Sequence, residues 1–169
     1  MGLQYDVIPS PVGGLFLAVD SSGQLRKLLF SRDEDLSRLV SHGDIHNPHA
    51  LVGPRKELEE YFRGVRTHFE TPLAPQGSAF QRLVWAELLK IPYGTTKSYL
   101  DVALCLGDAS AVRAVGTANG ANPIAIMIPC HRVIGSNGKL VGYRGGLETK
   151  RALLELERVG TPSLFGTTD

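Results

Sequence analysis

The tetrapeptide Pro129-Cys130-His131-Arg132 places a thiol beside an imidazole and a guanidinium. Cysteine reacts as its thiolate, and a neighbouring base or positive charge favours that form. The apolar run Ile124-Ala125-Ile126-Met127-Ile128 comes directly before the motif, so we expect the cysteine at the edge of a core. The motif therefore predicts a nucleophile held in a pocket. On these residues alone, a buried cysteine that acts only as a small hydrophobic side chain is the open alternative.

Short strands are expected in the first half of the chain. Residues 3–8 and 15–19 partly alternate in hydropathy, and a turn-forming sequence separates them, Pro9-Ser10-Pro11-Val12-Gly13-Gly14. With a third strand over 24–30, they predict a small antiparallel sheet. A short helix is expected over 33–40. A second helix is indicated by the helical spacing of Leu58, Tyr61 and Phe62, and Gly64 would end it as a C-terminal cap.

Helices are expected in the second half. Ser78 and Gln81 form a capping-box pattern at the start of one helix. A short helix over about 98–106 is followed by a turn at Gly107 and by a third helix that Asp108 would cap and that runs to about residue 119. This pair resembles a helix-turn-helix.

The last segment, 148–159, is amphipathic. It carries Glu157 late in the helix, where the helix dipole disfavours an acid.

These patterns together predict an α+β protein. Residues 71–77, which contain two prolines and a glycine, are the expected linker. We expect an N-terminal domain over residues 1–73, made of a small antiparallel sheet with helices. A C-terminal helical domain with a winged-helix-like helix-turn-helix is expected over 74–169. A chain of 169 residues is long enough for two small domains with cores of their own.

The charges are unevenly placed along the chain. The net charge of +1 argues against strong non-specific binding of polyanions. No acid occurs between Ala109 and Leu147, whereas Arg113, Arg132, Lys139 and Arg144 all do. A small one-sided basic patch is typical of a brief encounter with nucleic acid. Chance clustering in a Gly/Ala-rich stretch is an equal alternative.

The expected third helix has almost no bulky side chains. It is built mainly from Ala, Ser, Gly and Thr, and Arg113 is its one long side chain. A helix this slim can approach a narrow surface such as the DNA minor groove. Close packing of two helices through small residues explains the composition equally well.

The sequence also bears on the cellular location of the protein and on the state of its cysteines and histidines. No apolar run is long enough to cross a membrane, and the N-terminus has no signal-like segment, so a cytoplasmic protein is expected. Cys105 and Cys130 are expected as free thiols, with Cys105 in the core. His42, His46 and His49 are expected to be exposed loop histidines rather than a metal site.

Taken together, these residues resemble the O6-alkylguanine-DNA alkyltransferase family, which reverses DNA alkylation directly. The resemblance covers residues 80–157 and, more loosely, the N-terminal half. Its centre is residues 128–134 around Cys130. The surrounding motifs stand in the family's order and spacing: Arg113-Ala114-Val115-Gly116, Asn122-Pro123, Gly142-Tyr143 and Gly145-Gly146.

The resemblance implies a reaction in which Cys130 accepts the alkyl group of O6-alkylguanine in double-stranded DNA, irreversibly and once per molecule. Glu157, His131 and a bridging water would draw the proton from the thiol. The target nucleotide would be flipped out of the stack. Arg113 would fill the vacated space, and Tyr99 would assist base rotation and donate a proton to the guanine ring.

Further roles follow from the same resemblance. Asn122 would be the hinge between the helix-turn-helix and the cysteine loop, through bonds from its side chain to the backbone. Tyr143 would line the base pocket, and the backbone around Val133 would read the guanine edge. Arg144 stands where many relatives carry a small residue, which calls the acceptance of large alkyl groups into question. The remaining DNA contacts would come from Ser110, Ala114 and Thr117.

The resemblance implies a monomer that binds damaged duplex DNA and needs no metal, nucleotide or organic cofactor. An alternative of a different class is a non-catalytic sensor of alkylated DNA, like relatives that lack the acceptor cysteine. The presence of Cys130 argues against it. A regulator that senses alkylation through Cys130 is a third possibility, and the chain leaves little room for the response domain that it would need.

Overall fold

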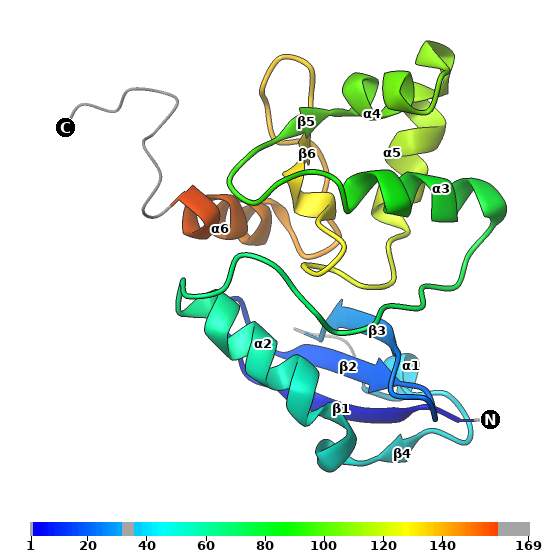
Figure 1. Ribbon diagram of the computed structural model, residues 1–169, viewed down its shortest axis with the longest axis vertical. Coiled ribbons are helices and arrows are strands. Elements are labelled where there is room, and N and C mark those ends of the chain that lie inside the picture. The colour runs from blue at the N-terminus through cyan, green and yellow to red at the C-terminus, as the bar shows by residue number, and fades with distance from the viewer. Residues whose placement is uncertain (1, 32–35, 159–169) are drawn as a thin grey trace.

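The computed structural model describes residues 2–31 and 36–158, with the sheet and the helices arranged as in Figure 1. Three strands form the antiparallel sheet that the sequence predicts, namely β1 (Gln4–Ile8), β2 (Leu15–Val19) and β3 (Leu25–Phe30). A fourth strand, β4 (Ile45–His46), pairs parallel to β1 and gives the order β3-β2-β1-β4. The sequence places His46 in a loop, because two residues are too few to show an alternating pattern.

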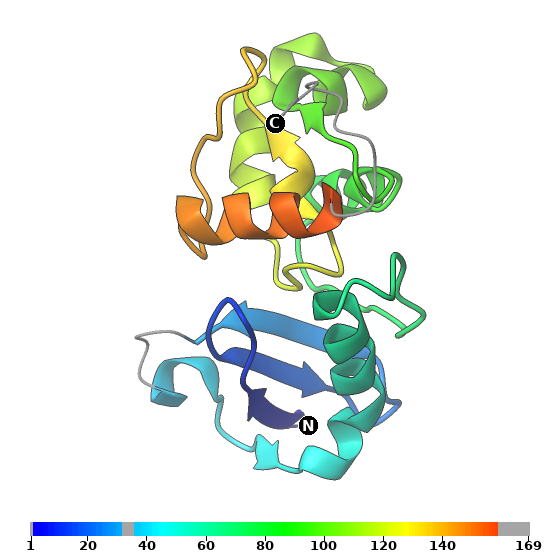
Figure 2. The same ribbon diagram turned by 90° about the vertical axis from the view of Figure 1, so that its left-hand side faces the viewer.

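The central strand β2 is buried on both faces. Leu15, Leu17 and Val19 belong to the main core, whereas Phe16 packs in a second cluster with Leu39 of α1 (Leu36–Leu39). The 3-10 turn η1 (Pro48–Leu51) leads into α2 (Val52–Phe62). This helix lies along the sheet in Figure 2. As predicted, Gly64 follows its end with a positive φ of 75°, a conformation that glycine adopts without steric cost.

The predicted helices of the second half are present. Helix α3 (Ala79–Leu88) begins with the capping box of Ser78 and Gln81, and α4 (Tyr99–Cys105) ends before Gly107. Asp108 caps a 3-10 turn, η2 (Ala109–Ala111), rather than an α-helix, and α5 (Val112–Gly120) continues from it. The helix-turn-helix therefore consists of α4 and α5 with a 3-10 turn between them.

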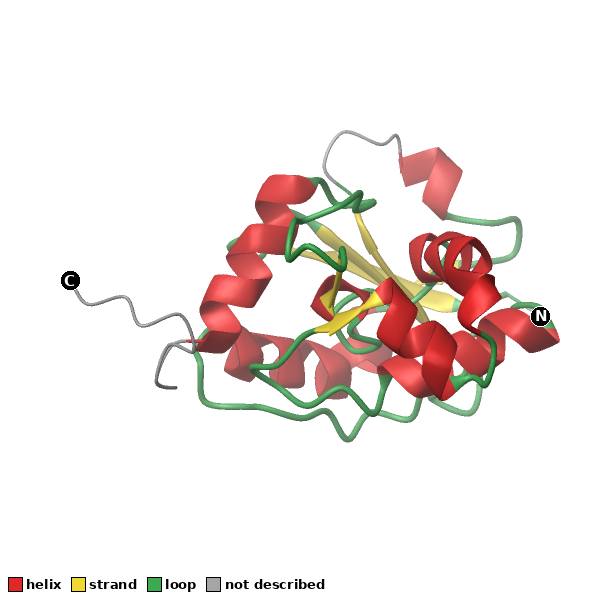
Figure 3. Ribbon diagram, turned by 90° about the horizontal axis from the view of Figure 1, so that it is seen from above, coloured by secondary structure: helices red, strands yellow, loops and turns green. Residues whose placement is uncertain are grey.

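The chain then forms η3 (Cys130–Arg132), β6 (Val133–Ile134) and α6 (Leu147–Arg158). Strand β6 pairs parallel to β5 (Lys97–Ser98), a short contact that the sequence did not predict. The predicted last residue of the final helix, Val159, lies outside the described residues. The structure confirms the α+β class, and helices lie on both sides of the strands when the molecule is seen from above (Figure 3).

The outer edge of β3 is covered by the linker and by a segment of the second half. Leu25 exchanges backbone hydrogen bonds with Pro72 and Ala74, at 2.8 and 2.9 Å. Leu28 does the same with Pro123 and Ala125, both at 2.9 Å. An edge strand needs such cover because its free N–H and C=O groups would otherwise stay unpaired. The sheet therefore holds the loop that leads to Cys130.

One hydrophobic core continues through both halves of the chain. It joins residues of β2 and α2 to Trp85 of α3, to Ile124 and to Leu153 of α6. The predicted boundary between residues 73 and 74 falls in the segment that covers β3, and the division into two domains stays a prediction. Among the described helices, none is long and apolar enough to cross a membrane.

Candidate active site

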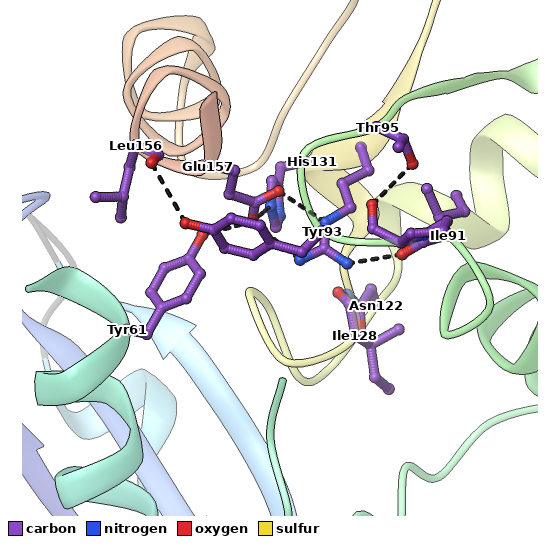
Figure 4. A network of polar contacts seen from close by, with 11 residues as sticks. Tyr61, Ile91, Tyr93, Thr95, Asn122, Ile128, His131, Leu156 and Glu157 are labelled. Carbon is purple, nitrogen blue, oxygen red and sulfur yellow. Dashed lines mark hydrogen bonds and ion pairs between the residues drawn. The ribbon is translucent and has the colours of Figure 1, made fainter. Parts of the chain in front are cut away.

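The loop before Cys130 is held in a fixed and strained shape. Ile126 is fully buried and has a φ of 69°, a conformation that β-branched residues rarely adopt. Asn122 braces this loop from both sides, since its Nδ2 donates to Ile128 O at 2.8 Å and its Oδ1 accepts from Ile124 N at 2.9 Å. Figure 4 shows Asn122 beside Ile128. These are side chain-to-backbone bonds of the kind expected of Asn122.

Cys130 lies at the wall of a cavity of about 580 Å³. This volume is in the range of small-molecule pockets, about 300–1,000 Å³. The cysteine itself is 5% exposed. The cavity gathers residues from β3, α4, α5, the cysteine loop and the segment before α6, including Phe30, Tyr99, Arg113, Thr117, Asn122, Tyr143 and Arg144.

The thiol of Cys130 is not reactive by itself. Burial raises its pKa, because the charged thiolate is poorly solvated there, and this outweighs the opposing effects of Asn122, Tyr143 and the Lys150 ammonium. At neutral pH the sulfur is therefore protonated. A nucleophilic role requires a base that removes this proton.

His131 is buried beside the carboxylate of Glu157 and has the properties of that base. Its Nε2 lies 2.6 Å from Glu157 Oε2. Burial lowers the pKa of His131, although Glu157 acts in the opposite direction, so the ring is neutral at pH 7. An ionised carboxylate only accepts hydrogen bonds, hence Nε2 carries the ring proton. The other nitrogen, Nδ1, has no hydrogen-bond partner within residues 2–31 and 36–158 and can accept a proton.

Glu157 stays ionised in spite of its burial. Arg132 donates from Nε to Oε1 at 2.8 Å and from Nη2 to Oε2 at 3.1 Å. Burial raises the pKa of Glu157, but the hydrogen bonds and charges of His131 and Arg132 overcome it and bring that pKa to about 2. Arg132 in turn donates from Nη1 to Ile91 O at 2.7 Å, and its guanidinium carbon lies 5.7 Å from the ring centre of Tyr93. These contacts explain why an acid is tolerated late in α6.

The sequence reasoning missed Lys150, a fully buried lysine near the thiol. Its Nζ donates to Val141 O at 3.0 Å and lies 5.9 and 6.0 Å from the ring centres of Tyr99 and Tyr143. Burial lowers the pKa of Lys150 to about 8. A signal was present, because Lys150 is spaced from Leu153, Leu154 and Glu157 as one face of a helix requires.

The residues predicted to contact DNA lie together on the surface. Ser110 of η2 and Arg113, Ala114 and Thr117 of α5 are all exposed. Arg113 and Thr117 also line the cavity, whereas Ser110 and Ala114 do not. A long cationic side chain therefore stands at the cavity that contains the thiol.

The predicted pocket residues divide into two groups. Tyr99, Tyr143 and Arg144 line the cavity. Val133 does not, since its side chain is fully buried and its N–H already donates to Cys130 O. The expectation that Cys105 lies in the core was wrong, because that cysteine is exposed at the end of α4.

The three histidines of the first half, His42, His46 and His49, are exposed, as expected. His46 contacts Asp6 Oδ1 through its Nε2 at 3.0 Å. In the part of the chain that the structure describes, no group of three metal-ligating side chains comes together.

Two family models match this sequence. Residues 3–75 match the ribonuclease-like domain of 6-O-methylguanine DNA methyltransferase, and residues 79–159 match the DNA binding domain of the same family. A methylated-DNA–protein-cysteine methyltransferase of Methanosarcina barkeri is 46% identical over 156 residues, which are 92% of this chain and 97% of that protein. The protein of the same name from Mycobacterium tuberculosis is 46% identical over 161 residues, with 95% and 96% covered.

Solved structures agree with these matches. The crystal structure of Mycobacterium tuberculosis O6-methylguanine methyltransferase is similar with a TM-score of 0.86 and 45% identity, and 99% of each chain is covered. The structure of Mycobacterium tuberculosis OGT in complex with DNA has a TM-score of 0.85 and 46% identity, with 95% of this chain and 96% of that chain covered.

Proposed function

The chain belongs to the 6-O-methylguanine DNA methyltransferase family and acts in direct-reversal DNA repair, and we propose that Cys130 is its alkyl acceptor. One observation carries this proposal. Cys130 opens onto the cavity that Arg113 and Tyr99 line, and the next residue is a neutral histidine held by an ionised glutamate. DNA is the partner of the protein, and O6-alkylguanine in a duplex is the proposed substrate.

The proposed reaction begins with proton transfer from the Cys130 sulfur, through a water, to Nδ1 of His131. Glu157 stabilises the imidazolium that results, because its carboxylate accepts the Nε2 hydrogen bond. The sulfur then attacks the alkyl carbon in line, a carbon–sulfur bond forms, and the bond from that carbon to guanine O6 breaks. The guanine receives a proton from Tyr99, whose ring lines the same cavity. A thioether is a poor leaving group, so each molecule reacts once.

Access to the base requires that the nucleotide leave the stack, at a cost of a few kcal/mol. Arg113 is exposed on α5 and lines the cavity, and these two observations support the proposal that its side chain fills the vacated space in the duplex. Ser110, Ala114 and Thr117 would contact the DNA around it. The small side chains of α5 let the backbone approach a narrow groove.

Further proposals concern the state of the protein. We place the DNA-binding and active-site domain at residues 74–169 and a supporting domain at 1–73. The protein would act as a cytoplasmic monomer without a metal or an organic cofactor. The non-catalytic sensor is not favoured, because the relatives that cover this chain are named as methyltransferases and Cys130 is present.

The test is the intact mass of the protein after incubation with a duplex that carries one O6-methylguanine, followed by peptide mapping. We expect one CH₂ to be added to Cys130, with the reaction stopping at one equivalent. Cys130→Ser should show no gain, and Cys105→Ser, the matched control at the other thiol, should behave as wild type. Methylation of Cys105, or tight lesion binding without any gain, would contradict the proposal.

A further inference from the structure

The first half of the chain contributes one side chain to the polar network around Glu157. Tyr61, on α2, donates its hydroxyl hydrogen to Glu157 Oε2 at 2.6 Å, and both residues are almost completely buried. The two residues are 96 positions apart in sequence. Figure 4 shows the Tyr61 hydroxyl at the carboxylate, on the side where α2 approaches.

The direction of this hydrogen bond is fixed by its surroundings. Burial and the neighbouring negative charge of Glu157 both raise the pKa of Tyr61 far above its ordinary value, so the hydroxyl keeps its proton. Glu157 is ionised, hence the tyrosine donates and the carboxylate accepts. Oxygen Oε2 therefore receives hydrogen bonds from Tyr61, His131 and Arg132, whereas Oε1 receives one from Arg132.

We propose that Tyr61 is a positioning residue for the alkyl transfer. Its hydroxyl fixes Oε2 of Glu157 in the plane where His131 Nε2 donates, and the histidine then keeps its unprotonated Nδ1 available to the thiol. The proposal rests on the proposed function of Cys130. It also assigns the N-terminal half a chemical role, since α2 carries the tyrosine.

The charged and titratable groups that face the His131–Glu157 pair come from η3, α6 and two loops besides α2. Arg132 lies on η3 with Cys130, and Lys150 lies on α6. Tyr93 precedes β5, and Tyr143 precedes α6. Loss of the Tyr61 hydroxyl leaves the Arg132 contacts in place, so Glu157 stays ionised. Its Oε2 then has one donor fewer and accepts more strongly from His131, which favours the imidazolium form.

The experiment compares Tyr61→Phe with wild type in the rate of methyl transfer from an O6-methylguanine duplex between pH 5 and 9. We expect the rate at pH 7 to fall roughly 10- to 100-fold, the loss typical of removing a group that orients a metal-bound histidine, which is a comparable positioning role. The acidic limb of the profile, where His131 becomes protonated, should move to higher pH. Affinity for the duplex should stay unchanged. Tyr5→Phe is the matched control, because Tyr5 lies in the same half and stacks on Phe16 away from the cavity.

A second variant tests whether Tyr61 acts through Glu157. In a Glu157→Gln background, the further change Tyr61→Phe should alter the rate less than twofold, since the group that it positions is gone. An unchanged rate and pH profile for Tyr61→Phe would overturn the inference, as would a slower rate with an unmoved acidic limb. In both cases a wild type that still methylates Cys130 would leave the proposed function intact, whereas a wild type that transfers nothing would refute that function itself.

Discussion

Replacement of Glu157 by Gln should destabilise the protein by about 3 kcal/mol at pH 7. The carboxyl has a pKa of about 2 in the folded protein and an ordinary value of 4.5. That difference corresponds to about 3 kcal/mol, because a change of one in pKa is worth about 1.4 kcal/mol. Loss of one partner from a buried ion pair costs about 3–5 kcal/mol, which agrees, since Arg132 would keep a buried charge without its carboxylate.

The sign of the pH dependence follows from the lowered pKa. Glu157 stabilises the fold fully above pH 4.5, and this stabilisation is lost as the pH falls from 4.5 towards 2. Between pH 7 and pH 3, the free energy of unfolding of wild type should therefore fall by about 2 kcal/mol more than that of Glu157→Gln. The two proteins should approach each other in stability as the carboxylate becomes protonated.

The measurement is urea-induced unfolding of wild type and variant at pH 7, 5, 4 and 3. Glu155→Gln is the matched control, because Glu155 lies on the same helix and is exposed. It should change the free energy of unfolding by less than about 0.5 kcal/mol at every pH. The reasoning would be refuted if the free energy of unfolding of Glu157→Gln followed that of wild type in parallel down to pH 3. It would also be refuted if the variant were destabilised at pH 7 no more than the control.

Three further predictions concern the cavity and its loop. Arg144→Gly should raise the transfer rate from O6-benzylguanine roughly tenfold, with the methyl substrate unaffected, because a bulky side chain is removed from the cavity wall; equal gains for both substrates, measured by quenched-flow mass spectrometry, would count against it. Arg113→Ala should slow transfer from duplex DNA roughly 10- to 100-fold and transfer from a single strand much less, since only the duplex pays for unstacking. A gel assay on matched oligonucleotides would decide, and equal losses on both would contradict the role. Asn122→Ala should cost about 1–3 kcal/mol in chemical unfolding, because it leaves the buried Ile124 N without its partner, whereas Ile128 O keeps its bond from Cys130 N; a cost below about 0.5 kcal/mol would mean that the loop holds its shape without this brace.

The parts of the fold that the sequence predicts are those with a local signal. The three long strands are separated by proline and glycine turns, and Ser78 with Gln81 starts α3 as expected. Strands β4, β5 and β6 have two residues each, too few to show any periodicity. They form because neighbouring backbone groups need partners, which is a property of the assembled fold.

The site likewise contains residues that a local sequence signal predicts and residues that it does not. Cys130, His131 and Arg132 are adjacent, so their chemistry can be read from one tetrapeptide. Tyr61 cannot be found in this manner, because its spacing with Leu58 is simply that of an apolar helix face. Its hydroxyl meets Glu157 only after the folded chain has brought α2 and α6 together.

In the proposed reaction, the reactivity of Cys130 depends on groups from both halves of the chain. Burial keeps the thiol protonated, so the proposal requires that His131 remove its proton. That histidine is oriented by Glu157, and Glu157 is held by Tyr61 of α2 as well as by Arg132. The edge of β3 also binds the backbone of the loop before the cysteine. The first half, which matches its own family model over residues 3–75, therefore contacts both the proposed base, through Glu157, and the loop that carries the proposed nucleophile.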